Sequence, residues 1–250
     1  MEESNISVEM GNLSVDGEGE GGLAYGEELT KTNSYCLYLV RRFLAKQVIN
    51  YNAMTQIMTF LWTPTLGIQP KELNGRLYIY QFCHEYDLNH IIEMSPWMFD
   101  NHLLLLEKME GHNHPMEVPL FYTRIWVQVH DLQVGFMSER VMRDIGEVIG
   151  EFVSTNLNNF TRMWKSYMRI RVRLDVWKPF RKGVRLKHMR GEWFCASFKY
   201  ERLLSLCFIC SLMGHTECFC LKHIEVAPVQ AVRMYSVDIQ APNCHSQMTI

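Results

Sequence analysis

The chain has 250 residues, of which 48% are hydrophobic and 12% aromatic, and this is enough apolar material for one sizeable core or two smaller ones. No stretch reaches the eighteen consecutive apolar residues of a membrane span, and the acidic N-terminus differs from the basic start of a signal or transit peptide. We therefore expect an intracellular protein, in the nucleus or the cytoplasm, with no membrane partner. The eight cysteines are too few and too scattered for a disulfide scaffold.

The net charge of -2 hides an uneven distribution of charge along the chain. Residues 1–30 hold eight acidic residues and no Lys or Arg, so the rest of the chain carries +6, which is -2 minus -8. Residues 162–190 contain eleven Lys and Arg against one acid, Asp175. This asymmetry indicates an anionic partner, and the alternative is a solvated basic face that binds nothing.

Residues 1–30 are rich in Gly and Glu and poor in large apolar groups. Such a segment cannot bury enough surface to offset its ordering entropy, so we predict a disordered acidic arm. From residue 31 to residue 112 the pattern predicts a folded domain. Its expected elements are an apolar run from Tyr35, a helix over 52–62, a weak strand over 68–73, a strand over 76–82, a helix over 86–94 and a strand over 102–109.

This order, β-α-β-β-α-β, is typical of a ferredoxin-like or RNA-recognition-motif (RRM)-like α+β unit. In such a unit Tyr78 and Tyr80 could form a stacking platform for bases, but the surrounding pattern favours a place in the core.

The pattern of residues 113–200 predicts a β-α-β-β continuation with its own strands and helix. Its expected elements are a strand over 125–132, a helix over 138–153 capped by Ser138, and strands over 167–177 and 192–203.

A metal-binding pattern lies in residues 201–224, which we predict to be a small zinc knuckle followed by a tail over 225–250. Cys207, Cys210, His215 and Cys220 have the spacing C-x2-C-x4-H-x4-C, which suits tetrahedral binding of one Zn²⁺ ion. Cys218 is an alternative third thiolate, and buried free thiols or a redox pair are the alternative to a metal site. Because four protein ligands leave no open position, the zinc is expected to be structural.

The segments YCLYLVRRFLAKQVIN, SPWMFDNHLLLL, VPLFYTRIWVQVHDL, YMRIRVRLDVWKPF and FKYERL, followed by the knuckle, resemble plant proteins that join a DUF4283 domain to a CCHC zinc knuckle. That family resembles the nucleic-acid-binding first-open-reading-frame (Gag-like) products of non-LTR retrotransposons. The resemblance covers roughly residues 30–222 and implies zinc and nucleic-acid binding, a retrotransposon-derived origin and no catalytic residues. Phe208 and Gly214 match the aromatic residue and the glycine of retroelement knuckles, whereas Ser211 stands where glycine is usual.

The knuckle itself lacks positive charge, because residues 207–220 contain no Lys or Arg. Its apolar residues Phe208, Ile209, Leu212 and Met213 either form a surface for stacking or pack inward. Phosphate contacts are therefore expected from the basic segment, in which alternate residues of one strand place Arg169, Arg171 and Arg173 on one face. The expected interface comprises Arg169, Arg171, Arg173, Lys178, Arg181, Lys182, Arg185, Lys187 and Phe208, with Trp164, Tyr167 and Trp177 available for stacking.

We therefore predict a non-enzymatic, zinc-dependent protein that binds nucleic acid, with single strands preferred. No Gly-rich phosphate loop, nucleophile elbow or H-E-x-x-H motif is present in the sequence, and no small-molecule substrate is indicated. The rival hypothesis is a protein-interaction or self-assembly module with a structural zinc ion.

Overall fold

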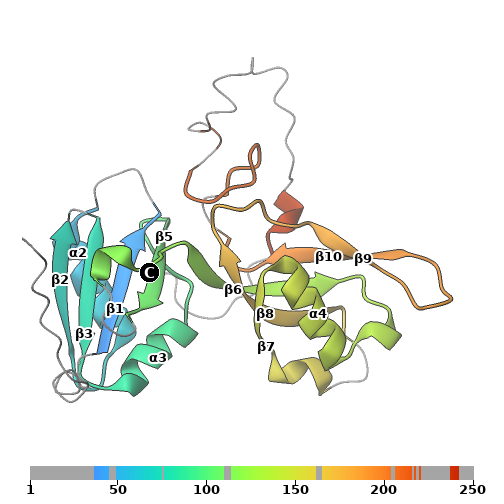
Figure 1. The fold of residues 1–250 in the computed structure, drawn as a ribbon, viewed down its shortest axis with the longest axis horizontal. Coiled ribbons are helices and arrows are strands. Elements are labelled where there is room, and N and C mark those ends of the chain that lie inside the picture. The colour runs from blue at the N-terminus through green and yellow to red at the C-terminus, as the bar shows by residue number, and fades with distance from the viewer. Residues whose placement is uncertain are drawn as a thin grey trace, which may run out of the picture. The chain divides into compact units, whose positions relative to one another are not determined.

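The computed structural model describes residues 37–44, 49–74, 76–109, 114–161, 165–203, 206–215, 217, 220 and 237–241, and the predicted acidic arm lies outside them. The described residues form two antiparallel five-stranded sheets with three α-helices, which confirms the predicted α+β class (Figure 1). None of these helices has the length and apolar character that a membrane crossing needs.

The first sheet has the strand order β2-β3-β1-β5-β4, and β1 pairs antiparallel with both β3 and β5. The predicted order β-α-β-β-α-β is confirmed, and the structure adds the short strand β4, which pairs with β5. The elements are β1 (Leu37–Phe43), α2 (Tyr51–Trp62), β2 (Ile68–Asn74), β3 (Leu77–Phe82), α3 (Glu85–Glu93), β4 (Trp97–Phe99) and β5 (His102–Lys108).

Helix α2 shows how local sequence sets these elements. Asn50 caps its N-terminus, because its side-chain oxygen accepts a hydrogen bond from the backbone N–H of Ala53 at 3.1 Å. Met54, Met58 and Trp62 recur every four residues, and all three are buried. The helix therefore lays one apolar stripe on the sheet.

The first sheet is apolar on both faces. On one face Tyr78 and Tyr80 of β3 pack in a buried cluster with the apolar stripe of α2, so their expected place in the core is confirmed and the stacking platform is excluded. The opposite face carries Val40, Ile79, Leu103 and Leu105, which are buried in the main apolar cluster of the molecule. Neither face of this sheet presents an open aromatic surface.

The second sheet has the strand order β7-β8-β6-β10-β9. Ser138 caps α4 as predicted, since its hydroxyl accepts a hydrogen bond from the N–H of Val141 at 3.4 Å. The elements are β6 (Tyr122–His130), α4 (Glu139–Ile149), β7 (Glu151–Thr155), β8 (Tyr167–Asp175), β9 (Gly183–Leu186) and β10 (Phe194–Tyr200). Short 3-10 turns lie at Pro115–Glu117, Val134–Phe136, Leu157–Phe160 and Val237–Ile239.

Two expectations for this region were wrong. The predicted helix over 138–153 ends at Ile149, and the chain enters β7 directly after Gly150. The backbone at Gly150 lies so close to β8 that a Cβ atom would be 2.5 Å from the carbonyl oxygen of Arg173, which only glycine allows. The short strand β9, which pairs with β10, was not predicted because four residues carry too little periodicity.

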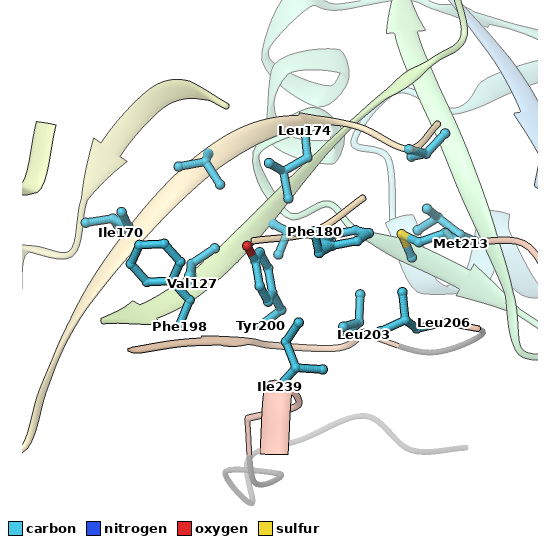
Figure 2. Packing of buried hydrophobic residues seen from close by; sticks show 14 of the residues in the cluster. Val127, Ile170, Leu174, Phe180, Phe198, Tyr200, Leu203, Leu206, Met213 and Ile239 are labelled. Carbon is cyan, nitrogen blue, oxygen red and sulfur yellow. The ribbon is translucent and has the colours of Figure 1, made fainter. Parts of the chain in front are cut away.

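The main apolar cluster lies on one face of the second sheet. Val127, Ile170, Leu174 and Phe198 come from its three central strands and are buried (Figure 2). Leu206 and Met213 of the knuckle and Ile239 of the last described turn belong to the same cluster. The knuckle is therefore part of the core and not a separate appendage.

One buried charge breaks the apolar pattern of the first sheet. The side chain of Arg41 in β1 is fully buried, and its guanidinium carbon lies 4.0 Å from the ring centroid of Tyr80 and 4.9 Å from that of Tyr78. No nitrogen of this guanidinium has a hydrogen-bond partner among the described residues. Burial lowers the pKa of Arg41 to about 10. The contacts of this cation are therefore mainly with the tyrosines around it, whose effect on the pKa opposes that of burial.

We expect the substitution Arg41→Met to leave the free energy of unfolding within about 1 kcal/mol of the wild type. The lost cation–π contacts are offset because a charge no longer has to be desolvated. The control is Leu39→Ala, an equally buried position on the same strand, which should lower that free energy by roughly 2–5 kcal/mol. Urea denaturation of the zinc-loaded chain measures both, and a loss at Arg41 as large as that at Leu39 would contradict the expectation.

Candidate metal centre and basic surfaces

The four predicted zinc ligands converge. The ligand atoms of Cys207, Cys210, His215 and Cys220 all lie within 4.8 Å of one another, and the Sγ atom of Cys210 is 3.2 Å from Nε2 of His215. Zn–S bonds of about 2.3 Å in a tetrahedron place sulfur atoms about 3.8 Å apart, which fits this spacing. The four residues therefore suit one structural zinc ion, with Cys220 as the last ligand. Cys218, the alternative third thiolate, lies outside the described residues.

The thiols of this centre are shielded from water. Burial, together with the nearby thiols of Cys207 and Cys220, raises the pKa of Cys210 to about 12. Thiolates in such a place are stable only beside a cation, because buried charge must be compensated. A divalent metal ion supplies that charge, and Zn²⁺ is the ion that three sulfurs and one imidazole favour.

Among the described residues from Cys207 to Cys220, Ser211 and Gly214 have positive φ angles. Gly214 has a φ of +92°, and a Cβ there would lie 2.7 Å from Cγ of Leu44, so this position needs glycine. Ser211 has a φ of 64° in the left-handed region that favours glycine. Its side chain is fully buried, and its hydroxyl oxygen has no hydrogen-bond partner in the described part of the chain. Serine is thus poorly suited to this position.

The apolar residues of the knuckle pack inward. Ile209 and Met213 are buried, and Phe208 is partly buried against the main apolar cluster. Leu212 packs against the buried cysteines. Of the two alternatives, inward packing is the one that the structure shows, and this argues against Phe208 as a free stacking surface.

The expected placement of Arg169, Arg171 and Arg173 on one face of β8 is confirmed, and the intervening Ile170 and Val172 are buried in the core on the other face. All three guanidiniums, however, already have partners in the protein. Arg169 makes a bidentate contact with Glu201, from Nε to Oε1 at 2.9 Å and from Nη2 to Oε2 at 2.7 Å. It also lies over the ring of Trp126, 4.1 Å from the centroid.

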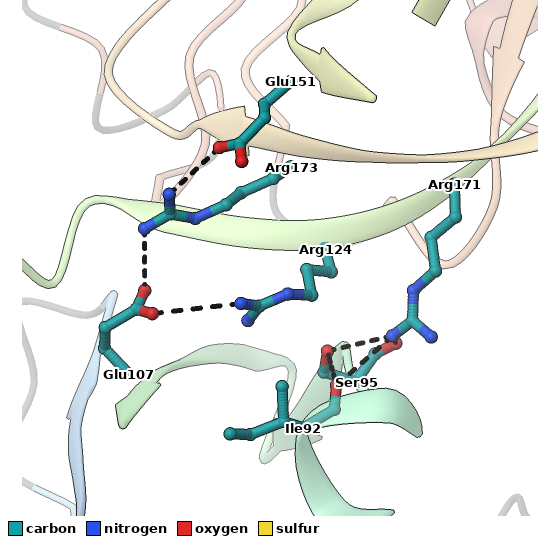
Figure 3. A network of polar contacts seen from close by, with 7 residues as sticks. All are labelled: Ile92, Ser95, Glu107, Arg124, Glu151, Arg171 and Arg173. Carbon is teal, nitrogen blue, oxygen red and sulfur yellow. Dashed lines mark hydrogen bonds and ion pairs between the residues drawn. The ribbon is translucent and has the colours of Figure 1, made fainter. Parts of the chain in front are cut away.

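Arg173 is held between two carboxylates (Figure 3). Its Nη2 is 3.0 Å from Oε2 of Glu107 and its Nη1 is 3.0 Å from Oε2 of Glu151. Burial lowers the pKa of Arg173, but the bonds to Glu151 and Glu107 outweigh it, so the pKa is raised above its usual value. Arg124 adds a longer contact to Glu107 at 3.9 Å. Arg173 therefore neutralises carboxylates of the protein itself.

Arg171 is buried against the end of α3 (Figure 3). Its Nη2 donates to the carbonyl oxygen of Ser95 at 2.9 Å, to the hydroxyl of Ser95 at 3.2 Å and to the carbonyl oxygen of Ile92 at 3.3 Å. A cation at the C-terminal end of a helix also meets the negative end of the helix dipole. The three arginines of β8 are thus engaged, which argues against a free row of guanidiniums for phosphates. Their assignment to nucleic acid stays a prediction.

The other predicted contacts lie outside this network. They fall on β9 and on the segments around it, and they are Lys178, Arg181, Lys182, Arg185 and Lys187. Lys178 forms an ion pair with Asp175 at 3.6 Å. Arg181, Arg185 and Lys187 are exposed and have no carboxylate at ion-pair distance among the described residues. Of the expected stacking residues, Trp177 is exposed, Tyr167 is half-buried, and Trp164 lies outside the described residues.

Trp193 was not among the predicted site residues. It is 58% exposed, and two cations lie over its ring, with Cζ of Arg185 5.5 Å and Nζ of Lys187 4.9 Å from the ring centroid. These residues come together because β9 and β10 form a hairpin. The only signal in the sequence was a tryptophan six residues after Lys187, which is uninformative until the strand pairing is known.

We expect Arg171→Met to lower the free energy of unfolding by roughly 1–3 kcal/mol, because it leaves the acceptors at Ser95 and Ile92 without their donor. The matched control is Arg181→Met, which removes an exposed arginine and should change stability by less than about 0.5 kcal/mol. Urea denaturation compares the two. Equal effects would show that the contacts of Arg171 contribute nothing.

We expect Ser211→Gly to raise the free energy of unfolding of the zinc-loaded protein by about 1 kcal/mol, since it removes both the strained φ angle and an unpaired buried hydroxyl. Gly214→Ala, the converse change in the same knuckle, should lower it. Thermal unfolding followed by circular dichroism gives both signs. A lower melting temperature for Ser211→Gly would refute this account of the turn.

Comparison with known proteins agrees with this architecture. An uncharacterized protein of Arabidopsis thaliana is 24% identical over 151 residues, which are 58% of this chain and 46% of that protein, so the chain matches less than half of that relative. No solved structure matches the chain. Residues 31–117 match the family model of a domain of unknown function, DUF4283, and residues 174–222 match that of a zinc knuckle, so the chain joins a DUF4283 domain to a zinc knuckle, as the resemblance implied.

Proposed function

We propose that this zinc-binding protein binds nucleic acid, preferably single-stranded, and that it is not an enzyme. The observation that carries the proposal is the combination of a four-ligand zinc knuckle with the exposed cations Arg185 and Lys187, which have no carboxylate at ion-pair distance among the described residues. Zinc knuckles commonly serve nucleic-acid binding, and exposed Arg and Lys supply the phosphate contacts that dominate affinity. A filled coordination sphere favours a structural role for the metal.

The order of motifs in the sequence supports descent from the first open reading frame of a non-LTR retroelement, and we include this origin in the proposal. Such an origin fits a protein that coats or chaperones nucleic acid and performs no chemistry on it. It also fits a chain in which the knuckle packs into the core while Arg181, Arg185 and Lys187 are exposed.

Protein–protein interaction or self-assembly is the second candidate. It is favoured by exposed apolar side chains on and next to α2, where Phe60 is 73% and Leu66 61% exposed. Apolar groups of this kind bind other proteins by removing apolar surface from water. This hydrophobic contribution to the binding free energy depends only weakly on salt concentration. Salt dependence therefore separates the two candidates.

We expect the full chain to bind single-stranded RNA or DNA more tightly than duplex, with an affinity that falls as salt rises. Each phosphate contacted should contribute about 0.7 to the log–log slope for a single strand. Fluorescence anisotropy at several salt concentrations measures this slope. A flat dependence, or no binding of any oligonucleotide, would remove the nucleic-acid proposal and leave the interaction module.

The role of zinc in this binding is tested by two cysteine variants. Cys220→Ser removes a buried ligand, whereas Cys83→Ser changes an exposed cysteine outside the metal centre. We expect only the first to lose zinc, melt at a lower temperature and bind nucleic acid more weakly, because the knuckle packs in the core. Full affinity in Cys220→Ser would show that binding does not need the zinc.

A further inference from the structure

The second sheet has a polar face on the side opposite its apolar cluster. Strand pairing sets which residues share it: Tyr167 lies opposite His130, His130 opposite Ser197, and Cys195 opposite Arg185. Paired residues point to the same side of a sheet, and alternate residues of each strand share that side. The face therefore runs across four neighbouring strands, β8, β6, β10 and β9.

The edge of this face at β9 carries exposed cations and an exposed ring. Arg185 and Lys187 lie over Trp193, and the residues of the connecting turn from Lys187 to Trp193 are exposed throughout. Arg190 in the turn has no carboxylate at ion-pair distance within the described ranges. Cations that flank an aromatic ring can contact phosphates while the ring stacks on a base.

The centre of the face carries a second ring pair. The rings of His130 and Tyr167 are 5.1 Å apart and tilted by 33°. Lys199, on the outward side of β10, is close enough to His130 that it lowers the pKa of the histidine in addition to the larger effect of burial. Both effects favour the uncharged imidazole and outweigh the opposing charge of Asp131, so the ring pair offers a flat surface and Lys199 supplies positive charge beside it.

At the end of the face farthest from β9, the arginine side chains are already bound by other groups of the protein. Arg171 on β8 is buried against Ser95, and Arg173 is held by Glu107 and Glu151. Arg169 is fixed by Glu201, so the accessible part of the face ends beside it. The corresponding face of the first sheet is apolar and buried, which leaves no equivalent platform there. Only the part from Tyr167 to Trp193 combines rings with exposed cations.

We propose that this polar face, defined by Tyr167, His130, Lys199, Cys195, Arg185, Lys187 and Trp193, receives a single-stranded nucleic acid that runs across the strands. This inference rests on the proposed function and gives it a surface. Four strands spaced by about 4.8 Å span about 14 Å, the scale on which an RRM sheet stacks two or three bases. A duplex fits poorly, because its bases are already stacked on one another and cannot reach the rings.

The binding test uses the full-length, zinc-loaded chain and a fluorescent 20-nucleotide single strand. Arg185→Gln/Lys187→Gln should weaken binding at least tenfold and reduce the salt slope by about 1.4, since each lost phosphate contact to a single strand reduces it by about 0.7. The matched control, Lys71→Gln/Arg140→Gln, removes the same charge from exposed positions on β2 and α4 and should change affinity less than twofold.

Stacking is tested at two tryptophans of similar exposure. Trp193→Ala should weaken binding about tenfold, whereas Trp177→Ala, which lies outside the face, should have little effect. Quenching of tryptophan fluorescence by the oligonucleotide should be smaller in Trp193→Phe than in the wild type. Larger losses at Trp177 than at Trp193 would overturn the assignment of the face.

Two exposed cysteines provide a footprint without any substitution. Cys195 lies on the proposed face and Cys83 follows β3 in the first sheet. We expect the oligonucleotide to slow maleimide labelling of Cys195 and not of Cys83, with the sites resolved by peptide mass spectrometry. Equal labelling with and without oligonucleotide would overturn the assignment.

The outcomes separate the two proposals. If the wild type binds no oligonucleotide, the proposed function fails. If it binds but the Arg185/Lys187 and Trp193 variants behave like their controls, only the surface is wrong. Displacement of the oligonucleotide by polyglutamate at an equal concentration of charge would show a site for acidic chains in general and would also overturn the assignment of this face to nucleic acid.

Discussion

Each central strand of the second sheet must bury one face in the same apolar cluster. The positions of the polar face of this sheet and of the zinc knuckle depend on this constraint. Val127, Ile170 and Phe198 supply that face from three neighbouring strands. Because side chains alternate along a strand, burying these residues forces their neighbours to the other side. The polar face, with its arginines and rings, is a direct consequence of how the core is built.

The same constraint draws the zinc centre into the fold. Leu206 and Met213 flank the metal ligands and belong to the main cluster, and Gly214 lies against Leu44 at the end of β1. Zinc therefore holds a turn whose apolar residues complete the core. A knuckle in this position is a structural support, and Phe208 is partly buried in that packing. The surface that contacts a partner has to be sought elsewhere on the chain.

Charge content alone does not identify that surface. Arg171 and Arg185 are two arginines in one basic segment, yet the first is buried in hydrogen bonds to α3 and the second is exposed beside a tryptophan. Carboxylates far away in sequence, such as Glu107 and Glu201, neutralise the basic strand β8. A cation already paired with a carboxylate must give up that partner before it can bind a phosphate, so Arg185 on β9 and Lys187 directly after it are the better candidates.

The sequence by itself determined the features that depend on short-range spacing. The four zinc ligands lie within fourteen residues, and the cap at Ser138 and the β-α-β-β-α-β order of the first domain follow from local patterns. Only the tertiary structure decided what depends on residues distant in sequence. The pairing of Arg169 with Glu201, the inward packing of Met213 and the place of Trp193 beside Lys187 follow from strand register and core packing. Periodicity shows which residues share a face of a strand, but not which groups lie opposite that face.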